Sequence, residues 1–439
     1  MSDALPLPPH PNLEHYRKLA KDLQNACKSQ TDEAIRNWAE RWAARIAGFQ
    51  GRQAVEFRTH IERVQLQFRK LRQSNESVAR CTLAGAQFVL ARWHGFASWP
   101  KFAKHLAALE RAGSPESNFE TAVDAIVNGD AETLERLLRA HPELVRARST
   151  REHRSTLLHY VSANGVEDFR QKTPPNIVEI ARILLHAGAG VNAESDAYGG
   201  GSTTLGLTAT SVHPEVAGVQ IPLMELLVSR GAVLDGTGGG SIVNACLHNG
   251  RGEASEWLAA HGARLDLEGA AGVGRLDLVQ TFFTPDGSLI PPATPAQVTN
   301  GLAWACEFGR TAVVDFLLRR GLKVDEKLPH HGQTPLHWAA YGGHSRTVEA
   351  LLERGAPVHA TDDAFHGTPL EWALYQWANS PLRASRASYY ETVALLVRAG
   401  AQLRAEWFTG DDRERTEAMR RLRGDAQMQA ALRGEFPDK

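Results

Sequence analysis

The sequence predicts an all-α protein in which a small N-terminal helical domain precedes a long solenoid of stacked helix pairs. Apolar residues recur at helical spacing from Asn12 onward, which predicts amphipathic helices. From Phe119 to about residue 404 these helices come in pairs, and most pairs end on a Gly-Ala or similar turn. A recurring helix pair indicates a repeat architecture, because each pair needs its neighbours to bury its apolar face.

Residues 1–113 form the predicted N-terminal domain. A Pro-rich lead-in covers residues 1–11, and helical segments follow from Asn12 and at about 31–48, 52–73 and 77–94. Gly95 is placed to end the fourth helix, and Ser98 is placed as the N-cap of a fifth, with Pro100 in its first turn. An aromatic cluster is expected at this corner from Trp93, Phe96, Trp99 and Phe102.

Three further boundaries complete the predicted organisation. A linker at residues 112–117 leads into the solenoid at 118–404, and residues 405–439 are expected to form a capping helix and tail. The apolar side of that last helix would cover the open end of the stack, where an uncapped solenoid exposes a repeat interface. Its apolar residues are Ala418, Leu422, Met428 and Leu432.

The turn that ends each second helix sets the register of the solenoid. It occurs at Gly188-Ala189, Gly231-Ala232, Gly262-Ala263, Gly321-Leu322, Gly355-Ala356 and Gly400-Ala401. The interval between Gly262 and Gly321 is too long for one repeat, which predicts a degenerate fifth helix pair at about 267–291. This register gives about eight helix pairs in the whole solenoid, and insertions are expected near residues 166–176, 211–221 and 377–389.

The stretch 331–362, HGQTPLHWAAYGGHSRTVEALLERGAPVHATD, is the clearest of these units. Thr334 is placed as an N-cap before Pro335, and Gly343 can end the helix in a left-handed conformation. A second helix carries Leu351 in its apolar stripe.

With its T-P-L-H start, helix pair and Gly-Ala turn, this stretch resembles an ankyrin repeat of about 33 residues. The resemblance implies an ankyrin-repeat α-solenoid with short β-hairpin fingers, in which His337 ties successive loops together by hydrogen bonds. Residues 5–110 resemble a small helical domain that precedes ankyrin repeats in many bacterial proteins, and this second resemblance implies no activity.

Histidine and glycine patterns that could indicate chemistry have a structural explanation. Six histidines lie between His330 and His366, but no His-x3-His pair with a carboxylate falls on one helix face. The glycine runs 199–201 and 238–240 precede helices as phosphate loops do, but they lack a Gly-Lys-Ser/Thr ending and fall where the fingers are expected. No nucleophile motif occurs. We therefore expect no enzyme, no cofactor and no metal site.

The cysteines and the N-terminal residues give an indication of the cellular compartment of the protein. Cys27, Cys81, Cys246 and Cys306 show no CxxC spacing, so buried free thiols and a reducing compartment are expected. The first residues lack the features of a signal peptide, and no segment reaches the roughly 18 apolar residues of a membrane helix. These observations predict a cytoplasmic protein without membrane contact.

Charge is spread unevenly along the chain. Residues 1–113 hold 18 Lys and Arg against 10 Asp and Glu, a net charge of +8, which leaves −9 for the remainder. This asymmetry predicts either that the two parts dock or that the basic domain binds nucleic acid or another polyanion, with the repeats as a regulatory module. Many of the basic residues alternate with acids and no nucleic-acid-binding motif occurs, so nucleic acid is not the expected partner.

The ankyrin resemblance implies a protein partner, held on the concave surface formed by the fingers and first helices. In the family, contact residues come from the finger tip and from the end of the first helix. Carried onto this sequence, these positions are His330, His331, Gln333 and Tyr341, with Glu307 and Phe308 one repeat earlier and Tyr375 and Gln376 one repeat later. An alternative for Phe308 and Tyr341 is that they pack on a neighbouring helix.

Overall fold

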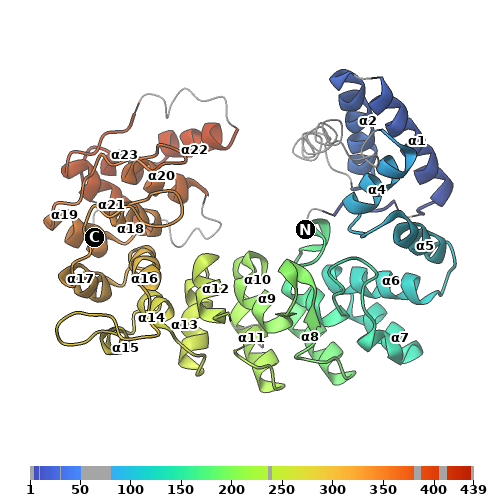
Figure 1. The fold of residues 1–439 in the computed structure, drawn as a ribbon, viewed down its shortest axis with the longest axis horizontal. Helices are drawn as coiled ribbons and strands as arrows, with labels where there is room; N and C mark the ends of the chain where they lie inside the picture. The colour runs from blue at the N-terminus through green and yellow to red at the C-terminus, as the bar shows by residue number, and fades with distance from the viewer. Residues whose placement is uncertain are drawn as a thin grey trace. The chain divides into compact units, whose positions relative to one another are not determined.

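A computed structural model of the chain describes residues 4–8, 10–29, 31–50, 81–235, 240–379, 387–404 and 413–436 (Figure 1). Helices dominate these residues, so the predicted all-α class is confirmed. The only sheet in this part of the chain pairs two short strands, β1 (Glu194–Ser195) and β2 (Ser202–Thr203). The chain divides into two compact units, Met1–Gly238 and Gly239–Lys439. The boundaries predicted at residues 113 and 404 stay predictions.

The first unit begins with a group of N-terminal helices around an aromatic core. These helices are α1 (Leu13–Lys28), α2 (Asp32–Gln50), α4 (Leu83–Trp93) and α5 (Trp99–Leu109). Trp93 stacks on Trp42 with ring centroids 4.9 Å apart, and Phe102 contacts both Phe96 and Trp99, at 5.2 and 5.8 Å. The predicted aromatic corner is therefore present. The helical segment expected at 52–73 lies outside the described residues, as do residues 77–80 of the next one.

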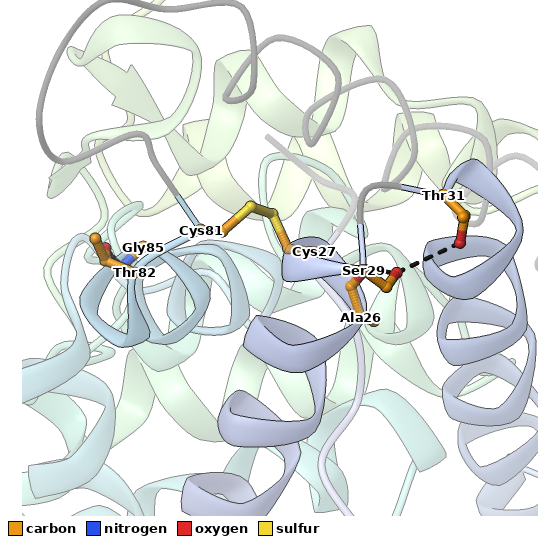
Figure 2. The surroundings of a disulfide bond; sticks show 7 residues. All are labelled: Ala26, Cys27, Ser29, Thr31, Cys81, Thr82 and Gly85. Carbon is orange, nitrogen blue, oxygen red and sulfur yellow. Dashed lines mark hydrogen bonds between the residues drawn. A yellow bond between two sulfur atoms is a disulfide. The ribbon is translucent and has the colours of Figure 1, made fainter.

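The expectation of four free thiols is wrong for two of the cysteines. Cys27, at the end of α1, forms a disulfide with Cys81, just before α4, and the two Cα atoms lie 5.5 Å apart (Figure 2). Sequence spacing gave no sign of this pair, because 54 residues separate the two positions and the fold brings them together. Cys246 and Cys306 are free and buried, as expected. The disulfide removes part of the support for a reducing compartment.

The two ends of this disulfide are held by local hydrogen bonds. Beyond Cys27, the Ser29 hydroxyl donates to the Ala26 carbonyl at 2.7 Å, and beyond Cys81 the Thr82 hydroxyl caps α4 by accepting from the Gly85 N–H at 3.0 Å (Figure 2). A cross-link across so long a chain segment stabilises mainly by restricting the unfolded chain, by about 3–4 kcal/mol in the chain-entropy model.

The predicted linker at 112–117 is shorter than expected, because α6 (Pro115–Asn128) starts within it. Ser114 caps this helix by accepting from the Ser117 N–H at 3.1 Å, and its hydroxyl donates to the Ala108 carbonyl in α5. The N-terminal helices also contact the loop at 148–156: the Glu152 N–H donates to the Gly95 carbonyl at 2.9 Å, and Arg92 pairs with Glu152. Inside this unit, the N-terminal helices therefore dock on the first helix pairs.

The remainder of the first unit consists of short helices and one hairpin finger. Its helices are α7 (Ala131–Ala140), η3 (Pro142–Arg146), η4 (Leu157–Ser162), η5 (Asp168–Arg170), α8 (Ile177–His186), η6 (Ala197–Gly199), α9 (Thr204–Thr210), α10 (Val212–Val216) and α11 (Gln220–Ser229). The expected first helix of the second pair is a 3₁₀ helix, η4, yet His159 there still contacts Thr156 and reaches the Ser202 carbonyl at 3.2 Å. Glycines 199–201 form the finger turn with positive φ, as predicted, rather than a phosphate loop.

The insertion near 166–176 carries a buried ion network that the sequence analysis did not foresee. Arg170 binds Glu120 at 2.7 Å and Asp124 at 2.8 Å, and Arg151 binds Glu120 at 2.6 Å and Glu167 at 2.9 Å. Burial opposes ionisation of Glu120, but the two arginines outweigh it and lower its pKa to about 2. The network joins α6 to the insertion, so removal of one partner leaves a buried charge uncompensated.

We expect Arg170→Met to lower the free energy of unfolding by about 3–5 kcal/mol, since Glu120 and Glu167 lose a buried partner. Wild-type stability should also fall as the pH drops from about 5 towards 2. A carboxyl whose pKa is lowered by folding contributes stability above its unfolded pKa and loses it on protonation. Urea unfolding at a series of pH values measures both effects.

The matched control is Arg182→Met, which removes an exposed pair with Glu179 on α8. Exposed pairs contribute about 0–1 kcal/mol, so this variant should unfold almost as the parent does. Equal losses in the two variants would contradict a stabilising role for the buried network.

The second unit is a regular stack of helix pairs. It contains α12 (Ile242–His248), α13 (Gly252–Ala260), α14 (Leu267–Gly272), α15 (Leu276–Thr281), α16 (Pro295–Glu307), α17 (Thr311–Arg319), α18 (Pro335–Gly342), α19 (Ser345–Glu353), α20 (Pro369–Asn379), α21 (Ala387–Arg398), α22 (Arg413–Gly424) and α23 (Ala426–Ala431). The first helices α14, α16, α18 and α20 pack side by side, and so do the second helices α17, α19 and α21 (Figure 1).

The degenerate fifth pair, α14 and α15, is present and short, with six residues in each helix. Asp266 replaces the usual threonine cap by accepting from the Gly269 N–H at 2.8 Å. A Cβ at Gly272 would overlap the Leu247 side chain, so the close approach of α12 requires glycine there. At the other end of the stack, α22 packs on α20 and α23 on α21, with Ala418 and Met428 buried, and the capping role stays a prediction.

We expect Leu351→Ala in α19 to lower the free energy of unfolding by about 2–5 kcal/mol, because Leu351 is fully buried. Leu276→Ala in α15 should cost clearly less, since Leu276 is only half-buried. Chemical denaturation of the two variants tests the ranking, and equal losses would contradict it.

Candidate functional site

A pocket of about 940 Å³ opens in the second unit, between the ends of the first helices and the fingers. Its walls come from the loop after α12, from α16, α18 and α20, and from the finger that precedes α20. Six of its residues carry large aromatic rings. They are Trp304, Trp338, Tyr341, Phe365, Trp372 and Tyr375.

Five of these rings, all except Tyr375, contact one another in a continuous row. Ring centroids lie 5.5 Å apart for Trp304 and Trp338, 6.2 Å for Trp338 and Tyr341, and 5.5 Å for Tyr341 and Trp372. Most of the contacts are edge-to-face, which is the geometry that aromatic pairs prefer. Their separation in the sequence explains the row: Trp304, Trp338 and Trp372 are each 34 residues apart, so they occupy the same place in successive repeats.

Two of these indoles donate hydrogen bonds to buried carboxylates, which fix the orientation of the rings. The Trp304 N–H donates to Glu268 at 2.8 Å, and the Trp372 N–H donates to Asp362 at 3.0 Å. Asp362 also accepts from the backbone N–H groups of Phe365 and Gly367, at 2.7 and 2.8 Å, and so fixes the finger that carries Phe365. The pocket wall is therefore held in place by its own supporting contacts.

The repeat ties that the sequence predicted lie directly behind this wall. His337 accepts the Thr334 N–H at Nδ1, 3.1 Å away, and its Nε2 lies 3.0 Å from the Gly367 carbonyl in the next finger. At the end of α18, Gly343 is left-handed with a φ of 69°, and a Cβ at Gly342 would collide with the Glu307 carbonyl. The close approach at Gly342 brings α16 and α18 together at the pocket floor.

Two carboxylates of the pocket differ in how they are compensated. Glu371 is held by Arg404, with Nε and Oε1 2.8 Å apart, and also accepts from the Thr368 N–H at 2.9 Å. Glu307 is 8 % exposed, and its Oε2 has no hydrogen-bond partner among the described residues. Burial raises the pKa of Glu307 to about 8, although nearby Arg251 opposes this shift. Glu307 is thus a buried carboxyl whose charge is poorly compensated.

A family model for three copies of ankyrin repeats matches residues 267–362 and 302–406. Residues 267–406 are ankyrin repeats. The resemblance seen in the sequence is confirmed, and most of the pocket lies within the matched ankyrin residues. No curated protein matches the chain. Ankyrin repeats generally mediate protein–protein interaction, and proteins that contain them are typically non-enzymatic.

The structure brings five of the eight predicted contact residues together. Glu307, His330, Tyr341, Tyr375 and Gln376 all line the pocket. Each of these positions follows the ankyrin register, as Glu307, Tyr341 and Tyr375 show by their spacing of 34 residues.

Phe308, His331 and Gln333 lie elsewhere. The Phe308 ring packs against α13, close enough that a Cβ at Gly252 would lie 2.8 Å from it, which is the alternative considered for this residue. Gln333 is 1 % exposed, so its expected outward position is wrong. The bond from the Leu328 N–H to the Gln333 carbonyl closes the finger turn, and the Gln333 side chain faces the interior. His331 is exposed on the finger.

The sequence analysis missed several pocket residues, chiefly Trp304, Trp338, Trp372, Phe365 and Arg251. The 34-residue spacing of the three tryptophans was a usable signal, since identical residues at one register position share a surface. Phe365 and Arg251 carry no such signal, because one lies in a finger and the other after a helix of a different pair.

In the part of the chain that the structure describes, no three His, Cys, Asp or Glu side chains are grouped so that they could hold a metal ion. Within the same residues, no helix has the length and apolar character that crossing a membrane requires.

We expect Glu307→Gln to remove a pH dependence of stability. A carboxyl with a raised folded pKa keeps its proton longer in the folded than in the unfolded protein. The free energy of unfolding therefore falls as the pH rises from about 4.5 to about 8. The slope for one proton is at most about 1.4 kcal/mol per pH unit. In thermal unfolding at several pH values, the stability of Glu307→Gln relative to the wild type should increase as the pH rises through this window. The exposed variant Glu349→Gln should show the same pH dependence as the wild type.

Proposed function

We propose that the chain is a non-enzymatic interaction scaffold and that it binds a protein partner through the ankyrin surface around this pocket. The main observation behind this proposal is that large aromatic side chains are exposed beside the pocket: Phe365 is 74 % exposed and Tyr375 is 49 % exposed. Neither ring is needed to fill the core. Exposed aromatic side chains beside a pocket are frequent binding anchors, because they bury a large area at a small entropic cost.

Several features of the same surface favour protein binding. The row of rings is broad and crosses three successive repeats, which suits an extended partner segment rather than a compact metabolite. Gln376 and Arg404, which also holds the buried Glu371, provide polar hydrogen-bonding groups beside the aromatic rings.

In the alternative proposal, residues 1–113 bind a polyanion, but two of their basic side chains already have acidic partners. Arg92 is paired with Glu152 and Arg17 with Glu14. We therefore place the binding function on the ankyrin repeats.

Site-specific photo-crosslinking tests the proposal. A benzophenone amino acid placed at Tyr375 should form adducts in an extract of the source cell, and Phe365→Ala in the same chain should reduce them at least severalfold. The control position is Ile290, which is 40 % exposed and lies outside the pocket. Thermal stability of Phe365→Ala should match the parent, because exposed positions change stability by only about 0.5 kcal/mol. Adducts of equal yield at both positions would refute a pocket-centred surface.

A further inference from the structure

We propose that the pocket receives a basic side chain, a lysine or an arginine, of the protein partner, with Glu307 as its counter-charge and the aromatic row as its wall. This inference rests on the proposed function and specifies the chemistry of the partner.

The first observation is the unpartnered oxygen of Glu307. Buried polar atoms are almost always hydrogen-bonded, and a buried carboxyl without a partner destabilises the fold. Glu307 Oε2 is such an atom, and the residue lines the pocket. An ammonium or guanidinium group carries several N–H donors and a positive charge. It would supply the hydrogen bond that Glu307 Oε2 lacks and a positive charge to compensate the carboxylate.

The second observation is the kind of wall that surrounds this carboxyl. Tyr341 lines the same pocket as Glu307, and Trp338 and Trp372 contact Tyr341 in turn. Aromatic faces attract cations through the negative centre of the ring, tryptophan most strongly. The methylene stem of a lysine or arginine would at the same time cover apolar ring surface. An aromatic enclosure with one carboxyl suits a cation better than an anion or a neutral chain.

Two other side chains of the pocket, Arg404 and His248, have acidic partners. Arg404 is held by Glu371, and His248 lies 2.8 Å from Glu268. Arg251 interacts with both Glu307 and Tyr341 and would favour an anion. Burial outweighs the attraction of Arg251 and raises the pKa of Glu307 to about 8, so this carboxyl is protonated at neutral pH. A basic side chain that enters the pocket displaces this proton and pairs with the carboxylate.

Five blocked pentapeptides that differ only at the central residue test the proposal on the full chain. Their sequence is Gly-Gly-X-Gly-Gly, and X is lysine, trimethyl-lysine, arginine, norleucine or glutamate. Binding is followed by the fluorescence of the pocket tryptophans and by calorimetry, at constant ionic strength. Norleucine has the apolar stem of lysine without its charge. We expect the lysine and arginine peptides to bind at least about tenfold more tightly than the norleucine peptide. The trimethyl-lysine peptide keeps the charge but has no N–H donor, so it should bind more tightly than norleucine and less tightly than lysine.

Glu307→Gln should reduce this preference for basic peptides at least severalfold, and Glu349→Gln, on the exposed side of α19, should leave it unchanged. Should Glu307→Gln fail to fold, Tyr375→Ala removes an exposed part of the wall and should weaken the basic peptides instead. Equal binding of the lysine and norleucine peptides, tighter binding of the glutamate peptide, or no binding of any basic peptide overturns the inference.

The crosslinking experiment separates this inference from the proposed function. Suppose that adducts form at Tyr375 but the lysine and norleucine peptides bind equally well. The scaffold proposal would then stand, and only the inference that the pocket binds a basic side chain would be rejected. A lack of adducts at Tyr375 would count against the scaffold proposal itself.

Discussion

The side-by-side packing of the first helices is the contact on which the second unit depends. Small residues make this packing possible: Ala303, Ala339 and Ala373 are completely buried, and a Cβ at Gly301 would lie only 3.0 Å from the Cβ of Ala271. Because each repeat touches only its neighbours, a stack of this kind has no central core, and every interface between repeats must be filled. The tie from His337 to the Gly367 carbonyl then fixes the finger of one repeat on the helix of the previous one.

The pocket is a consequence of this regular packing. With a repeat of 34 residues, the side chains on either side of the packed alanines come to lie one beside the next on the same surface. Trp304, Trp338 and Trp372 form the deep part of this row, and Glu307, Tyr341 and Tyr375 form the next position along it. Glu307 occupies the place that tyrosine holds in the two following repeats. A carboxyl therefore lies where the fold otherwise places an aromatic ring, and its Oε2 atom has no hydrogen-bond partner in the described residues.

The first unit uses the same tie with different packing. His159 bonds Thr156 and reaches the Ser202 carbonyl, as His337 does with Thr334 and Gly367, although its helix is 3₁₀. The insertion at 166–176 places Arg170 and Glu167 inside the unit, where Arg170 forms ion pairs with Glu120 of α6 and with Glu167. In this unit a buried charge network joins the insertion to α6, and Oε2 of Glu167 lacks a hydrogen-bond partner among the described residues, as Oε2 of Glu307 does in the second unit.

The sequence by itself determined what is local or periodic. Caps, left-handed glycines, the helix pairs and the tie from His337 follow from a few neighbouring residues, and the register of the repeats follows from recurring turns. Only the tertiary structure decided which distant side chains meet. Cys27 and Cys81 form a disulfide across a long chain segment, Arg170 reaches Glu120, and Phe308 and Gln333 turn away from the surface that holds Tyr341. Periodicity predicts the face of a helix on which a residue lies. Burial and pairing depend on the atoms of other segments that cover that face, and the sequence does not encode these contacts at any fixed spacing.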